Sequence, residues 1–198
     1  MVITTYSELK TAIADWTHRS DLTNHLDTFI DLAEARMNRE LRMSEMETRA
    51  TITASSEYVA MPTGALEIRN IQVNGSYTYT VEYKTPAQMD KDNNGATGAP
   101  TFYTIIGDEF QFYPVPTSTE IEVTYYKAIT ALDDTNTTNF LLTSHPECYF
   151  HGCMTYAKIY MMDDHSFDET EFTRIMASLN RISTRKKFSG APMQVRTA

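Results

Sequence analysis

Apolar residues near the N-terminus recur every three or four positions, which is the period of an amphipathic helix. A first helix is predicted from about Tyr6 to Trp16, because Thr5 and Glu8 have the spacing of a capping box. A second, longer helix is predicted by apolar residues at the same spacing, namely Leu22, Leu26, Phe29, Ile30, Ala33, Met37 and Leu41. The charged residues among them, Glu34 included, are mixed in sign and typical of the solvated face of a helix.

The period changes to two at about Arg49 and stays so until about Ala128, which predicts about seven short antiparallel strands. Asn74-Gly75 lies between two alternating runs and predicts a hairpin with a type I′ turn. Gly107-Asp108 predicts a second hairpin. Tyr77, Tyr79 and Tyr83 alternate after the first turn, and such a row could bind sugars or stack on bases. Aromatic pairing across strands also accounts for it and is the favoured interpretation.

The helical period returns between Thr138 and Glu147. Thr143 or Ser144 is expected to cap the returning helix, with Pro146 in its first turn, where a missing N–H costs nothing. A last helix is expected to begin near Asp163–Ser166, with apolar residues at Phe172, Ile175, Met176, Leu179 and Ile182.

This order of elements predicts an α+β fold with three parts. Residues 1–48 and 129–188 are expected to form a bundle of about four helices. Residues 49–128 form an inserted antiparallel β-domain of short strands, and residues 189–198 form an extended C-terminal tail. At 198 residues, the chain is long enough for one good core, or for one core with a satellite layer.

Composition and charge narrow the classes of function. No apolar run approaches the roughly 20 residues that a membrane span needs, and the N-terminus lacks the pattern of a signal peptide, so we expect synthesis and folding in a cytoplasm. The net charge of −9 argues against a free DNA-binding protein. From Phe172 onward, however, the chain has no acidic residue. Its last helix there carries a basic face, which either complements the helix dipole or docks on a partner: Arg174, Arg181, Arg185, Lys186 and Lys187.

Candidate chemistry is sparse. His145, Cys148, His151 and Cys153 are metal-ligand types, but on one helix they would point in different directions, which favours ordinary packing over a metal site. The two cysteines are too poorly oriented to pair and are expected to be buried thiols. The sequence has no phosphate-binding loop, nucleophile elbow or zinc-protease motif. We therefore predict no catalytic residue, no cofactor and no metal.

Several segments, in this order and spacing, resemble the head-to-tail adaptor proteins of tailed bacteriophages. They span nearly the whole chain: residues 26–42, 100–107, 113–116, 125–126, 138–146 and 188–192. None is a chemical motif, so the resemblance depends on their order.

The resemblance implies a structural protein of the virion neck, made in the bacterial host cytoplasm. Such a protein forms a ring, expected to have twelve copies, between the portal protein and the tail or nozzle proteins, with a channel that DNA crosses only in transit. No membrane is involved. The C-terminal segment is implied to dock on the portal through Phe188, Ser189, Gly190, Pro192, Met193, Val195 and Arg196. A baseplate or tail-completion subunit, or a carbohydrate-binding module on the tyrosine-rich sheet, remain alternatives.

Overall fold

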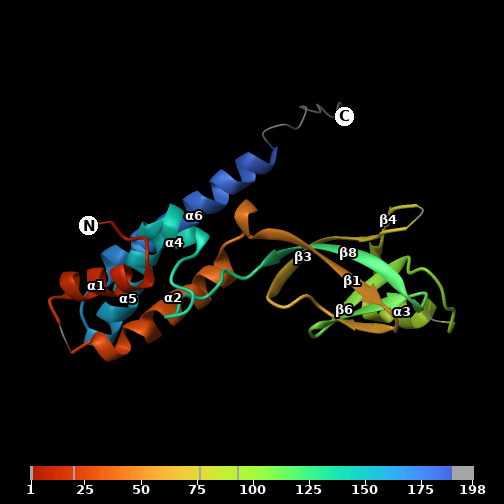
Figure 1. The fold of residues 1–198 in the computed structure, drawn as a ribbon, viewed down its shortest axis with the longest axis horizontal. Coiled ribbons are helices and arrows are strands. Elements are labelled where there is room, and N and C mark those ends of the chain that lie inside the picture. The colour runs from red at the N-terminus through yellow and green to blue at the C-terminus, as the bar shows by residue number, and fades with distance from the viewer. Residues whose placement is uncertain (1, 20, 76, 93, 189–198) are drawn as a thin grey trace. The chain divides into compact units, whose positions relative to one another are not determined.

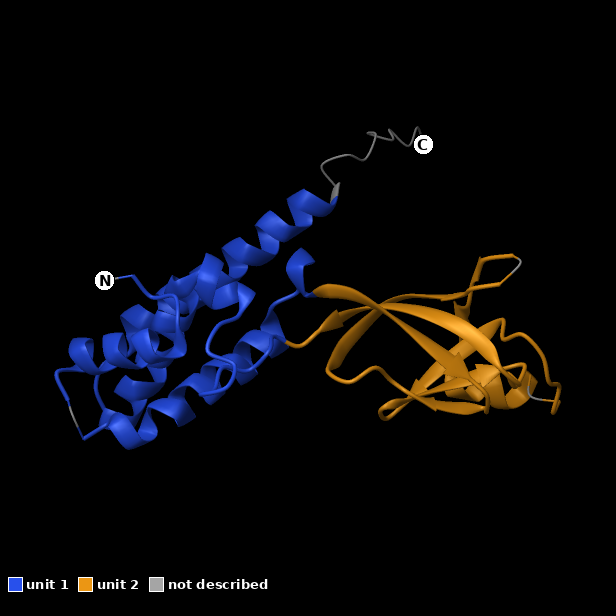
Figure 2. Cartoon of the chain, viewed as in Figure 1, with its two compact units in different colours: residues 1–46, 129–198 blue, residues 47–128 orange. Residues whose placement is uncertain are grey.

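The computed structural model describes residues 2–19, 21–75, 77–92 and 94–188 (Figure 1). The chain divides into two compact units, which Figure 2 distinguishes by colour. A helical unit comprises residues 1–46 and 129–198, and a β unit comprises residues 47–128. The α+β fold class is thereby confirmed.

The described part of the helical unit contains five α-helices, more than the expected four. They are α1 (Tyr6–Thr17), α2 (Leu26–Glu40), α4 (Phe140–Ser144), α5 (Pro146–Met161) and α6 (Ser166–Phe188), with 3₁₀ turns at Thr23–His25 and Ser44–Met46. The Thr5–Glu8 capping box of α1 is present as predicted. None of the described helices combines the length and the hydropathy of a membrane span.

The extra helix arises at the return into the helical unit, where the predicted cap was wrong. Thr143 and Ser144 lie inside α4, and Asn139 caps that helix by accepting a hydrogen bond from the Leu142 N–H at 2.9 Å. Pro146 occupies the first position of α5, as expected. Because a residue before proline avoids the helical conformation, His145 takes φ −141° and ψ 59°, which separates α4 from α5.

The core of the helical unit forms around α5, which contacts α1, α2, α4 and α6. Gly152 of α5 lies against Ala33 of α2 and Phe172 of α6. The largest fully buried side chains of this unit come from all the longer helices, and include Leu9, Ile13, Leu26, Ile30, Met37, Tyr149 and Phe172.

The β unit contains two four-stranded sheets and the short helix α3 (Pro86–Asp92). One sheet has the order β1-β8-β3-β4, with β1 (Glu47–Ala54), β8 (Thr119–Lys127), β3 (Ala65–Val73) and β4 (Tyr79–Thr80). The other has the order β2-β7-β6-β5, with β2 (Tyr58–Ala60), β7 (Glu109–Tyr113), β6 (Phe102–Ile106) and β5 (Glu82–Tyr83). The buried core of the β unit draws on both sheets and includes Ile71, Phe110, Phe112, Ile121 and Val123.

Two expectations for the β unit require correction. Val73 pairs with Tyr79, so five residues separate the paired ends of β3 and β4, and the two-residue type I′ turn at Asn74-Gly75 was wrong. In addition, β5 pairs with β6 in parallel, so the strands are not all antiparallel. The hairpin at Gly107-Asp108 is confirmed by the pairing of Ile106 with Glu109. Tyr79 and Tyr83 belong to different sheets, and the tyrosines therefore do not form one row.

Candidate docking surface

The C-terminal helix α6 carries the basic face that the sequence singled out. It begins where the Asp164 carboxylate accepts a hydrogen bond from the Ser166 N–H at 2.9 Å, as the sequence indicated. Asp168 and Glu169 lie in its first turn, and Arg185, Lys186 and Lys187 lie in its last. This distribution of charge matches the helix dipole at both ends.

One side of α6 is fixed to α2 by charged and polar contacts. The Arg36 guanidinium donates two hydrogen bonds of 2.7 Å to the Glu169 carboxylate. The Asn180 side chain donates to the Glu40 carbonyl at 3.0 Å and accepts from the Arg42 N–H at 2.9 Å. A bidentate pair combined with a side chain that satisfies backbone groups fixes the rotation of a helix about its axis.

Asp168 fixes the start of α6 to α5. Its carboxylate is almost fully buried and lies 2.8 Å from Nδ1 of His151 and 2.5 Å from Nζ of Lys158. Both partners are more exposed than Asp168. His151, one of the four metal-ligand candidates, is thus held by a carboxylate of its own chain.

We expect Asp168→Asn to lower the free energy of unfolding by about 2 kcal/mol, because the Lys158 ammonium loses its buried counter-ion and His151 loses the carboxylate beside its Nδ1. Urea unfolding followed by circular dichroism would measure this change. Glu171→Gln is the matched control, since it breaks the pair with the exposed Arg174 on the same helix and should change stability little. Equal effects of the two substitutions would contradict the assigned role of Asp168.

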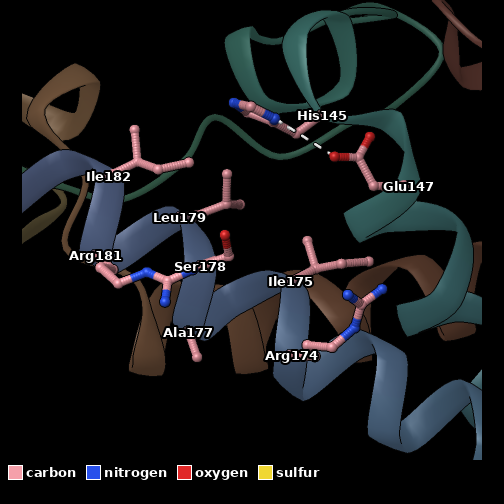
Figure 3. A pocket seen from close by; sticks show the side chains of 9 residues that line it. All are labelled: His145, Glu147, Arg174, Ile175, Ala177, Ser178, Leu179, Arg181 and Ile182. Atoms are coloured by element: carbon pink, nitrogen blue, oxygen red, sulfur yellow. Dashed lines mark ion pairs between the residues drawn. The ribbon is translucent and has the colours of Figure 1, made fainter.

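A groove of about 650 Å³ runs along the other side of α6 (Figure 3). Ile175, Leu179 and Ile182 point from α6 toward His145 and Glu147 at the junction of α4 and α5. Leu179 is buried, as the helical period predicted, but Ile182 is 54% exposed. Ile182, the last of the apolar positions predicted for this helix, therefore lines a surface groove and does not join the core.

The five residues of the predicted basic face have different surroundings. Arg174 and Arg181 line the groove. Arg174 pairs with Glu171 in the next turn toward the N-terminus of the helix, and Lys186 pairs with Glu45 at 2.6 Å. Arg185 is exposed and Lys187 is half-buried, both in the last turn. Of the residues assigned to portal docking, Phe188 ends α6, whereas Ser189, Gly190, Pro192, Met193, Val195 and Arg196 lie outside the described residues.

The two cysteines among the metal-ligand candidates pack in the core of the helical unit. Cys148 and Cys153 are both free and buried in the core. Burial raises the pKa of the Cys148 thiol to about 12 and raises that of Cys153 well above its usual value. Across the part of the chain that the structure describes, no three histidine, cysteine, aspartate or glutamate side chains gather as metal ligands would.

One buried acid differs from the prediction made from the sequence. Glu34, expected on the solvated face of α2, is only 4% exposed. Its Oε1 accepts hydrogen bonds from the Tyr149 hydroxyl at 2.8 Å and from the Leu132 N–H at 3.0 Å. Burial raises the pKa of this carboxyl to about 7, against the opposing effect of the two hydrogen bonds. Its position four residues after the buried Ile30 was the one signal in the sequence.

Comparison with known proteins agrees with a structural role. No curated protein matches the chain significantly. The model of the SU10 adaptor protein family matches residues 4–196, which is nearly the whole chain and includes both units. Adaptors of this kind are structural components of the phage particle, not enzymes. The resemblance to phage head-to-tail adaptors is thereby confirmed, and the chain belongs to the SU10 adaptor protein family.

Proposed function

We propose that this adaptor forms a ring in the virion neck, between the portal protein and the tail or nozzle proteins, with a central channel for DNA. The observation that carries the proposal is the family match over residues 4–196. The ring, expected to have twelve copies, acts by matching shapes and charges at its two ends. We assign it no catalytic step, cofactor or metal.

The end of α6 and the residues that follow it are the proposed portal-docking element. This helix exposes Arg181 and Arg185 on its way to the C-terminus, while Phe172 and Met176 anchor its first half in the core. Anchoring the helix at one end allows the other end to present the C-terminal segment to a partner.

The net charge of the chain is compatible with a channel for DNA. At −9 per copy, an acidic channel wall would repel phosphates and let DNA pass, whereas a cationic wall would retain it. We propose that DNA is a passing cargo and not a bound ligand. The same charge makes a membrane or nucleic-acid scaffold a poor alternative partner.

Deleting residues 189–198 should abolish binding to the portal of the same phage while leaving the protein folded. The physical reason is that the buried residues of α6, such as Phe172 and Leu179, lie before the deleted segment, since this helix ends at Phe188. Co-sedimentation with purified portal rings would measure binding, and a thermal melt would report folding. Lys91→Ala, which removes an exposed cation of the β unit, is the control and should bind normally.

Retained portal binding by the deletion variant would refute the docking assignment. A melting temperature lowered as much as by a core substitution would show that the segment has a structural role instead. Imaging of labelled adaptor in the particle separates the neck from a baseplate position. Glycan binding with a saturable affinity would favour the carbohydrate-binding alternative.

A further inference from the structure

We infer that neighbouring copies join head to tail, with an acidic face beside α2 of one copy seated in the α6 groove of the next. This inference rests on the proposed ring and names the surfaces that close it. The groove is the one lined by Ile175, Leu179 and Ile182 and edged by Arg174 and Arg181. The acidic face is defined by four exposed carboxylates, Asp27, Asp31, Asp133 and Asp134.

The four carboxylates share one corner of the helical unit. The charges of Asp27, Asp31 and Asp134 all act on the Tyr6 hydroxyl. Those of Asp31 and Asp133 act on the buried Glu34. Negative charge from α2 and from the 129–139 segment therefore gathers within reach of the same two side chains, and Asp27 also pairs with Lys10 at 2.9 Å.

The acidic face and the groove lie on different sides of α2. Glu34 reaches the 129–139 segment through the Leu132 N–H, whereas Arg36 reaches α6 through Glu169. Two residues apart on a helix correspond to a rotation of roughly 200°, so α2 has the 129–139 segment on one side and α6 on the other.

The basic edge of the groove in turn faces away from α2. Glu169, Thr173 and Asn180 mark the side of α6 that contacts α2 or its last residues. Arg174, Ser178, Arg181 and Arg185 follow each other at helical spacing, on a stripe centred roughly 130° around the helix from that side. Across the helical unit, the acidic face is therefore followed by α2, then by α6, and then by the basic stripe.

Opposite charge on opposite sides is what a head-to-tail contact requires. A two-fold dimer through either surface would bring like charges together, which electrostatic repulsion disfavours. A contact between the two different surfaces pairs Arg181 with carboxylates and covers Ile182. Such heterologous contacts generate rings when the rotation between copies closes. The partner that best fits the groove is therefore a second copy of this chain.

Charge reversal on each surface tests this assignment. Arg181→Glu alters the groove and Asp31→Lys alters the acidic face, and each should weaken self-association at least about tenfold by placing like charges together. We expect an equimolar mixture of the two variants to assemble again with the variants alternating, because the unaltered acidic face of Arg181→Glu meets the unaltered groove of Asp31→Lys and the two reversed surfaces also carry opposite charge. The double variant in one chain should assemble again, since both of its surfaces are reversed. Lys91→Glu, an exposed reversal in the β unit, is the control.

Assembly is followed by analytical ultracentrifugation at low salt, with and without purified portal rings, and circular dichroism confirms that each variant is folded. If Arg181→Glu or Asp31→Lys assembles like the wild type, or if the double variant fails to recover, the assigned interface is wrong while the proposed ring stands. If the wild-type chain neither associates nor binds the portal, the proposed function itself fails.

Discussion

Replacing Gly152 with valine is expected to lower the free energy of unfolding by about 3 kcal/mol or more. A Cβ atom at this position would lie 3.0 Å from Cζ of Phe172 and 3.1 Å from Cβ of Ala33. Phe172 is fully buried and Ala33 Cβ is attached directly to the α2 backbone, so neither can move aside cheaply. The branched side chain would therefore push α2 and α6 away from α5, which is overpacking of a closed core.

Urea unfolding of the helical unit would measure the loss, with Ala177→Val as the control for the lower helix propensity of valine at an exposed site. Gly152→Ala should give a much smaller change, because the gain in helix propensity of about 1 kcal/mol opposes a smaller overlap. Coupling Gly152→Val to Phe172→Leu should restore part of the stability. If Gly152→Val lowers the free energy of unfolding no more than Ala177→Val does, then α2 and α6 do not pack against α5 as closely at Gly152 as described.

The second large effect is a dependence of stability on pH that originates from Glu34. Its pKa is about 7 in the folded chain, against 4.5 as the ordinary value, so the folded state holds this proton to higher pH than the unfolded state does. The contribution of Glu34 to stability is therefore full below about pH 4.5, falls as the pH rises toward 7, and stays lost above it. The loss is on the order of 3 kcal/mol, from 1.4 kcal/mol per pKa unit.

Glu34→Gln removes the titration while keeping an oxygen for the Tyr149 hydroxyl and the Leu132 N–H. The difference in unfolding free energy between this variant and the wild type should shift by that amount, in favour of the variant, between pH 4.5 and pH 8. Acids whose pKa is lowered in the folded chain, such as Glu169, make stability rise with pH over a lower range. Their contribution is the same in the variant and in the wild type, so it cancels in this difference. Glu82→Gln, an exposed substitution in β5, should give a profile parallel to the wild type. A flat difference for Glu34→Gln would place the native pKa near its ordinary value.

Features set by a few neighbouring residues were predictable from the sequence. The Thr5–Glu8 capping box and the Gly107-Asp108 hairpin depend on local backbone geometry, and both are confirmed. The expected pairing of tyrosines across strands is found between Tyr83 and Tyr103, but the stretch after Asn74-Gly75 is not one strand, because its alternation continues across a change of sheet. The Val81 N–H donates to Ile71 in one sheet, and the Glu82 N–H donates to Thr101 beside the other. A period-two pattern cannot reveal that successive residues pair with different strands.

The docking surface likewise combines features that the local sequence predicts with features that only distant contacts determine. The basic residues of α6 were visible in the sequence, but Ile182 continues the apolar period of Phe172 and Leu179 and differs from them only in what covers it. Glu34 was assigned to the solvated face because charge is a good local indicator of exposure, and only the tertiary contact with Tyr149 overrides it. Burial set by distant elements is the information that a periodic pattern lacks.

The anchoring of α6 also has a mechanical consequence. This helix has 23 residues, which makes a rod of roughly 34 Å at 1.5 Å per residue. Its ion pairs to α5 and α2, through Asp168 and Glu169, lie in its first turn, at the end remote from Phe188. Tension applied at the C-terminus would act lengthwise along the rod and would load the Asp168 and Glu169 pairs in shear, after the contacts of Asn180 and Lys186 nearer to that end.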